Sequence, residues 1–167
     1  DEGVNTHFLL ELLRYGKYEY NPENYHGPLI HFITAGLVKF LGLRDFTLRF
    51  SPVLFGIFQL LLLFLLKKPL KRSGVLTALV LMGFSPNIVY FARTFIHETY
   101  FTSLTLAAFA ALYFLFEKRN VRFLIPSALA IALMITVKET FVITLACWCV
   151  SAVLAWLITS KFKRHPR

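Results

Sequence analysis

Residues 90–101, with the sequence YFARTFIHETYF, place three ionisable side chains between two long apolar segments: Arg93, His97 and Glu98. Charged groups are costly to keep beside hydrocarbon, so such groups usually pair with one another or bind something. Arginine offers a planar set of donors that suits phosphate oxygens, and a carboxylate can accept a proton or orient the arginine. We expect Arg93 and His97, four residues apart, to share one side of a helix. The segment therefore predicts either a membrane anchor or a site for an anionic group.

The elements that must position these side chains are apolar. The chain has 167 residues, of which 57% are hydrophobic, and a soluble domain of this size would need far more polar surface. A helix needs roughly 20 apolar residues to cross a bilayer core. The sequence therefore predicts an all-α polytopic membrane protein with five transmembrane helices, at about 50–66, 73–92, 98–116, 121–137 and 140–160.

The charge pattern predicts an orientation and argues against a nucleic-acid partner. The net charge is +9, but many of the basic residues fall in three clusters, each separated from the next by two apolar segments. Two crossings return the chain to the same side, so the positive-inside rule assigns all three to the cytoplasmic face. Cys147 and Cys149 lie inside an apolar run, which favours neither a disulfide nor a metal site. The clusters are Lys67, Lys68, Lys71 and Arg72; Lys118, Arg119 and Arg122; and Lys161, Lys163, Arg164 and Arg167.

Residues 1–49 are predicted to form a long external loop with two interfacial amphipathic helices. The first has an apolar stripe at Val4, Phe8, Leu9, Leu12 and Leu13, and the second, within 28–41, has one at Ile30, Ile33, Leu37 and Leu41. We interpret His7 and His31 as interfacial polar residues rather than ligands. Residues 161–167 form a basic cytoplasmic tail. The opening Asp1-Glu2, without an initiator Met, predicts a fragment of a longer protein.

The external face should then gather acids and bases from distant parts of the chain. Its expected acids are Asp1, Glu2, Glu98 and Glu139, and the candidate cationic partners are Arg93, Lys138 and His26. Transporters usually place functional charges near the middle of the bilayer, whereas these charges lie at one edge. This favours a site at the external surface of the membrane.

The order of the motifs resembles a family of membrane enzymes. An acidic pair opens a long loop, then come a tyrosine-rich segment, YHGPLIHF at 25–32 and LGLRDFTLRFSPVLFG at 41–56. SPNIVYFARTFIHETYF at 85–101 is similar to a later element in which an arginine precedes a second acidic residue. These motifs resemble membrane glycosyltransferases that use polyprenyl-phosphate sugars. The chain is most similar to prokaryotic relatives of the dolichyl-phosphate-mannose protein mannosyltransferases, in the group called flippase-associated glycosylation proteins, from Asp1 to about Leu157.

The resemblance implies a C-type glycosyltransferase fold, in the plasma membrane of a prokaryote, with its active site on the external face. It implies that Asp1 is catalytic with Glu2 beside it, and that Glu98 is the second acidic position. The family's Lys-Pro-Pro-like element near the lipid phosphate corresponds to His26-Gly27-Pro28, next to Tyr25, so a histidine replaces the lysine.

The implied reaction is inverting transfer of a sugar, by family analogy mannose, from a polyprenyl-phosphate donor to a hydroxyl of a protein, glycan or lipid. Asp1 would be the base that takes the proton of the acceptor hydroxyl. A positioned base typically raises the reaction rate roughly 10²–10⁴-fold. Arg93 and Lys138, with His26 and Tyr25, would bind the phosphate, and His97 and Glu139 would support them. No cofactor is certain, and a divalent metal ion shared by Asp1 and Glu98 stays open. Two other functions also stay open: a lipid-linked-sugar flippase or transporter component, and a structural subunit of a glycosylation complex.

Overall fold

The computed structural model describes residues 2–20 and 26–164, with side chains as far as residue 160. Within these residues the regular elements are helices, apart from one isolated bridge between His26 and Lys138. This confirms the prediction of an all-α protein. The helices are α1 (Glu2–Tyr15), α2 (Leu29–Leu41), α3 (Asp45–Leu65), α4 (Lys67–Phe84), α5 (Pro86–Ala92), α6 (Glu98–Lys118), the short 3₁₀ helix η2 (Val121–Phe123), α7 (Leu124–Ile135) and α8 (Phe141–Arg164).

Among the described residues, three helices are long and apolar enough to cross a membrane: α3, α6 and α8 between Phe141 and Ser160. A fourth span is possible if α4 and α5 together count as one, although they are bent by 68°. The bend follows from Ser85-Pro86, because a proline pushes the preceding residue out of the helical region, and Ser85 is extended (φ −69°, ψ 117°). The helix α7 has 12 residues and is shorter than a span. The prediction of five spans stays a prediction.

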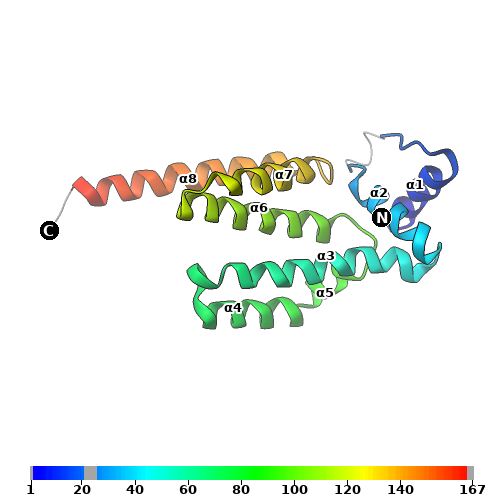
Figure 1. Ribbon diagram of the computed structural model, residues 1–167, viewed down its shortest axis with the longest axis horizontal. Helices are drawn as coiled ribbons and strands as arrows, with labels where there is room; N and C mark the ends of the chain where they lie inside the picture. The colour runs from blue at the N-terminus through cyan, green and yellow to red at the C-terminus, as the bar shows by residue number, and fades with distance from the viewer. Residues whose placement is uncertain (1, 21–25, 165–167) are drawn as a thin grey trace.

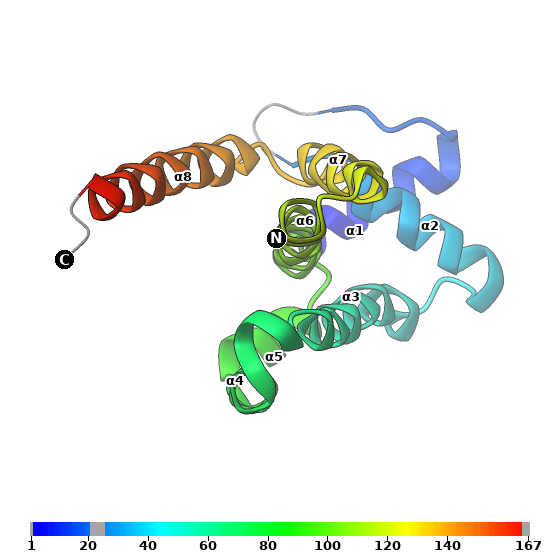
Figure 2. The ribbon, with the colours of Figure 1, turned by 60° about the vertical axis from the view of Figure 1, so that its left-hand side comes forward.

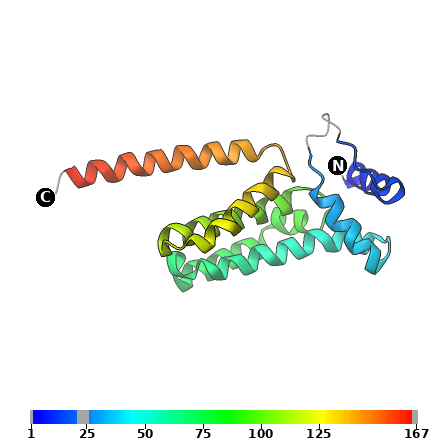
Figure 3. The same cartoon turned by 45° about the horizontal axis from the view of Figure 1, so that its top comes forward.

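The core of the bundle is the packing of α6 against α3 and α7. Tyr100 of α6 is fully buried, and its hydroxyl donates a hydrogen bond to Ser51 Oγ of α3 at 2.6 Å. The Ser103 hydroxyl donates to the Phe55 carbonyl at 2.9 Å, and small residues such as Ala108 and Ala130 let the helices approach closely. The helix α8 projects away from this bundle, and none of its apolar window is buried (Figure 2; Figure 3).

The bundle has two unlike ends (Figure 1). One end, which we call the basic end, carries the α3–α4 and α6–η2 junctions, with the first two basic clusters. There Lys68 forms an ion pair with Glu117. The other, which we call the covered end, holds α1, α2, the α5–α6 loop at 93–97 and the α7–α8 turn. The predicted acids and bases that the structure describes therefore gather near the covered end.

The two N-terminal helices dock through a more polar face than the sequence predicted. Leu9 and Leu12 of α1 are buried as expected, but Val4 is 44% exposed and Asn5 is buried. In α2 the buried face consists of Ile30, His31, Thr34 and Ala35. The interpretation of His31 as an interfacial polar residue was wrong. The residue is 1% exposed, because the helix turns this face toward α1 and the α5–α6 loop.

Candidate functional site

The segment with Arg93, His97 and Glu98 is not one continuous helix. Helix α5 ends at Ala92 and α6 begins at Glu98, so the prediction that Arg93 and His97 share one helical face was wrong. Arg93 follows the break at Pro86, and its exposed side chain lines an apolar groove with Val53 and other residues of α3, α4 and α5. Among the residues that the structure describes, no ion pair links Arg93 with Glu98. The arginine is thus turned toward a different surface from the one we expected.

Lys138 occupies the place beside Glu98. Its Nζ donates a hydrogen bond to Glu98 Oε1 at 2.9 Å, and both side chains are partly exposed. Glu98 lies in the first turn of α6, where the helix dipole favours a negative charge. Two groups that are 40 residues apart in the sequence are therefore joined at the covered end. This is one of the acid–base pairings that the predicted topology allowed.

The tripeptide His26-Gly27-Pro28 holds Lys138 in that position. The backbone N–H of Gly27 donates to the Val137 carbonyl at 2.9 Å, and the N–H of Leu29 donates to the Thr136 carbonyl at 3.2 Å. A Cβ atom at residue 27 would lie 2.1 Å from the Thr136 carbonyl oxygen. Only glycine permits so close an approach of two backbones. The motif therefore ties the start of α2 to the turn that carries Lys138.

The tyrosine-rich segment adds two further links to the same turn. The Tyr20 hydroxyl donates a hydrogen bond to the Glu139 carboxylate, and the Tyr18 hydroxyl donates to the His26 carbonyl at 3.1 Å. Glu139, predicted as a supporting residue, contacts the first loop. Asp1 and Tyr25, also predicted as site residues, lie outside the described residues.

Three histidines, the half-buried His26 and the buried His31 and His97, lie together next to this contact. The ring centroids of His26 and His97 are 4.2 Å apart, and those of His31 and His97 are 5.8 Å apart. His97 is fully buried. Burial lowers the pKa of His31 to about 4 and lowers the pKa of His97 further, with a smaller contribution from His26 in both cases. His31 and His97 are thus neutral near pH 7 and pack the site rather than neutralise a phosphate.

Glu2 is held at the start of α1 by two donors. Its Oε1 atom lies 3.5 Å from Nε of Arg49 and accepts a hydrogen bond from the Phe95 backbone N–H at 3.3 Å. The Asn5 side-chain amide donates to the Phe95 carbonyl at 3.0 Å. The two hydrogen bonds with Phe95 connect α1 to the α5–α6 loop, and only two residues separate Phe95 from Glu98. The structure therefore places Glu2 and Glu98 at the same end of the bundle.

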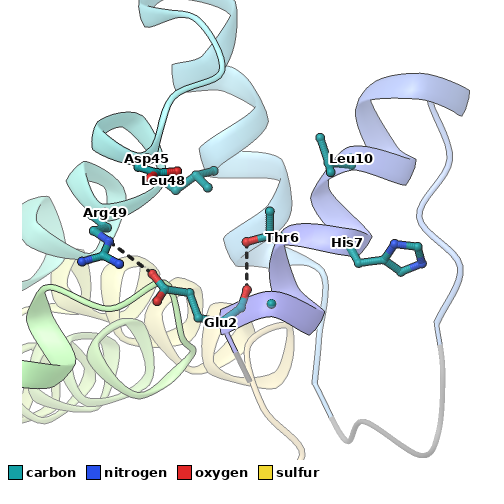
Figure 4. Close-up of a pocket in the computed structure, with 8 residues that line it drawn as sticks. Glu2, Thr6, His7, Leu10, Asp45, Leu48 and Arg49 are labelled. Atoms are coloured by element: carbon teal, nitrogen blue, oxygen red, sulfur yellow. Dashed lines mark hydrogen bonds and ion pairs between the residues drawn. The ribbon is translucent and has the colours of Figure 1, made fainter.

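A cavity of about 440 Å³ lies beside Glu2, between α1 and α3 (Figure 4). Sequence reasoning did not assign a role to its α3 residues, Asp45 and Arg49. A signal was present in the segment LGLRDFTLRF, because Asp45 and Arg49 are four residues apart and share one side of a helix. The cavity is lined by Glu2, Gly3, Thr6, His7, Leu10, Asp45, Leu48 and Arg49.

A metal ion shared by Asp1 and Glu98 stays a prediction, because Asp1 lies outside the described residues. No group of three His, Cys, Asp or Glu side chains with metal-binding geometry occurs among them. Glu2 is paired with Arg49, and Glu98 is paired with Lys138. A carboxylate held by a cation is a poorer ligand for a divalent metal than a free one. We therefore derive no step through a metal.

A family comparison agrees with the motifs. The model of the family described as dolichyl-phosphate-mannose-protein mannosyltransferase matches residues 25–166, which is most of the chain. The matched range includes the His26-Gly27-Pro28 tie, the Arg93–Glu98 segment and the Lys138 turn. Comparisons with curated proteins and with solved structures find no match.

Proposed function

The chain belongs to the dolichyl-phosphate-mannose-protein mannosyltransferase family, and from this we propose that it transfers a sugar from a polyprenyl-phosphate donor to an acceptor hydroxyl. The family supports a membrane glycosyltransferase that uses a lipid-linked sugar. Mannose as the sugar, the inverting course and the aspartate base are our finer proposals. The observation that supports the position of the proposed site is the pairing of Glu98 with Lys138 at the end where Glu2 is also held.

The proposed reaction is a single displacement. The acceptor oxygen attacks the anomeric carbon, the bond from that carbon to the phosphate oxygen breaks, and the polyprenyl phosphate leaves with the electron pair. The proton of the acceptor hydroxyl passes to Asp1. We assign this role to Asp1 because the family resemblance points to it and because Glu2, its neighbour, is already engaged by Arg49 and Phe95.

The phosphate needs cations that the structure leaves accessible. Lys138 is partly exposed, and Glu98 orients its ammonium group. Arg93 lies at the edge of an apolar groove, and we keep it as the second phosphate ligand on the resemblance, which requires its exposed side chain to turn from that groove toward Lys138. An arginine binds phosphate through two parallel hydrogen bonds, whereas a lysine acts as a point charge. Of the remaining predicted residues, we propose that His26, Tyr25 and Glu139 shape the donor pocket and that His97 packs beneath it.

The topology that accompanies this mechanism has five spans, with α4 and α5 forming one and α7 another. The helices α1 and α2 lie along the external interface, and residues 161–167 return to the cytoplasm. Such an arrangement puts the covered end outside the plasma membrane of a prokaryote and the basic end inside it. A lipid-borne sugar phosphate would then reach Lys138 from the membrane edge.

The test replaces Asp1 with Asn in the full-length protein and measures transfer from a labelled lipid-linked mannose. We expect the rate to fall by roughly 10²–10⁴-fold, as for loss of a positioned base. Glu19→Gln, an exposed carboxylate of the first loop, is the matched control and should keep full activity. Retained activity in the Asp1 variant would remove that residue from the mechanism. Movement of the headgroup across liposomes without a covalent product would instead identify a transporter.

A further inference from the structure

We propose that the cavity between α1 and α3 binds the acceptor, and that this acceptor is a neutral saccharide. This inference rests on the proposed function and adds the class of acceptor to it. The cavity is lined by Glu2, whose carboxylate also accepts a hydrogen bond from the α5–α6 loop. A ligand in the cavity would therefore lie against the same loop that leads into Glu98.

The charges of the lining argue against the donor phosphate as its ligand. The lining holds two carboxylates, Glu2 and Asp45, and one guanidinium, that of Arg49, so these three groups sum to a net negative charge. Arg49 is also engaged, since its Nε lies 3.5 Å from Glu2 Oε1. The proposed phosphate ligands, Lys138 and Arg93, are not among the residues that line this cavity. Like charges repel, so a phosphate is expected to bind elsewhere.

The lining suits a ring with several hydroxyl groups. Carboxylates accept hydrogen bonds from hydroxyl groups, a guanidinium donates them, and the Thr6 oxygen keeps acceptor capacity while its proton is donated to the Glu2 carbonyl. Leu48, beside Asp45, and Leu10 add apolar surface to the lining (Figure 4). The volume of about 440 Å³ falls within the range of small-ligand pockets, ~300–1,000 Å³. A saccharide presents both hydroxyl groups and an apolar ring face, whereas a serine side chain offers one hydroxyl.

The decisive variant is Asp45→Asn, which removes a charge and keeps the shape. The full-length protein in lipid nanodiscs is given labelled polyprenyl-phosphate mannose and increasing concentrations of a panel of methyl glycosides of glucose, mannose, galactose and N-acetylglucosamine. We expect at least one glycoside to accept the sugar. For that glycoside, Asp45→Asn should raise KM by about tenfold or more and change kcat by less than about twofold, because a charged hydrogen bond to the acceptor is lost.

Two further variants make the result interpretable. Leu10→Trp narrows the cavity at a position that is 42% exposed and so tolerates a larger side chain, and it should raise KM in the same way. Glu19→Gln lies outside the cavity lining and should leave KM unchanged. The KM values of Leu10→Trp and Glu19→Gln test the inference even if Asp45→Asn fails to fold.

The outcomes separate this inference from the proposed function. If wild-type protein cleaves the donor in water but no methyl glycoside accepts the sugar, or if both cavity variants keep the wild-type KM, the acceptor inference is wrong and the transferase proposal stands. A serine peptide that accepts the sugar while the glycosides do not would also overturn it. If wild-type protein neither cleaves the donor nor transfers the sugar, the proposed function itself fails.

Discussion

The two ends of the bundle both place charged side chains next to apolar helices, but they hold these charges differently. At the basic end the charges lie on short junctions, and the Lys68 side chain is 77% exposed although it pairs with Glu117. At the covered end, α1 and α2 lie over the α5–α6 loop, and the contacts join segments far apart in the sequence. Examples are Glu2 with Phe95 and Glu98 with Lys138. The basic end has more cations, and its Lys68–Glu117 pair also joins distant segments, so neither the number of charges nor long-range pairing distinguishes a candidate site. The cover that α1 and α2 provide does distinguish it.

The sharpest test of this comparison removes one lysine from each end. Lys138→Met should lower kcat/KM for sugar transfer by roughly 10²–10³-fold, because one electrostatic contact to the departing phosphate is lost. Lys68→Met breaks the corresponding pair with Glu117 and should leave transfer within about twofold of wild type, since exposed ion pairs contribute little. Transfer from labelled lipid-linked mannose measures both. Equal losses in the two variants would mean that the covered end is not the site.

Glycine substitutions probe whether the covered end needs its close backbone contact. Gly27→Ala should lower the free energy of unfolding by about 2–3 kcal/mol, because a Cβ would overlap the Thr136 carbonyl oxygen, a backbone atom that cannot easily move. The counterpart near the basic end is Gly74→Ala, where the nearest atom is the Leu70 Cβ at 3.3 Å. There the change should stay below about 1 kcal/mol, partly offset by the helix propensity of alanine. Denaturant unfolding in detergent compares the two variants. An unchanged free energy of unfolding for Gly27→Ala would contradict the close backbone contact between Gly27 and Thr136.

Acid should loosen the covered end first. Because the pKa of His31 is lowered to about 4 in the folded protein, the unfolded state binds more protons as the pH falls from roughly 6.5 toward 4. Stability contributed by the neutral histidines is thus present above that window and lost within it, by on the order of 2 kcal/mol. Hydrogen exchange should show α1 and α2 losing protection before α3 does. Unchanged protection of α1 and α2 at pH 4.5 would refute this, and His31→Gln should weaken the pH dependence.

The smallest expected effect lies between the two ends. Tyr100→Phe removes the hydrogen bond to Ser51 and should cost about 1 kcal/mol, a typical value for one buried hydrogen bond. Because this bond joins α3 to α6 in the middle of the bundle, the loss should lower the melting temperature without a selective effect on α1 or α2. Tyr90→Phe, at an exposed tyrosine of α5, is the control and should melt like wild type. If both variants melt like wild type, the Tyr100 hydroxyl does not stabilise the α3–α6 packing.

Some of this architecture follows directly from the sequence and some does not. The apolar segments predicted helices because burial in hydrocarbon requires internally satisfied backbones. The even spacing of the basic clusters predicted that Glu98 and the Lys138 turn would share one end, as the structure shows. These inferences depend on the period and sign of side chains, which are local properties of the sequence.

The orientation of Arg93 and the burial of His31 could not be predicted from the period and sign of side chains along the sequence. The Ser85-Pro86 sequence accounts for the break before Arg93, but the surface that Arg93 meets is set by the packing of α5 against α3. His31 is buried because Phe8, Tyr18 and Phe95 come to lie around it, and these residues are distant in the sequence. Asp45 and Arg49 had the spacing of a functional pair, but only the docking of α1 shows the cavity that they line. Tertiary partners, rather than local patterns, decide such positions.

The contact between Gly27 and Val137 also bears on the order of folding. Its two partners are 110 residues apart in the sequence, so the first loop cannot complete its contacts until the α7–α8 turn has been synthesised. Contacts of such long sequence separation form slowly. Because synthesis proceeds from the N-terminus, the first loop is made long before its partner residues. During that interval α1 and α2 lack their final partners and expose apolar surface. Nascent chains that stop before Thr136 should therefore be cut in α2 by protease more readily than chains that extend past Phe141.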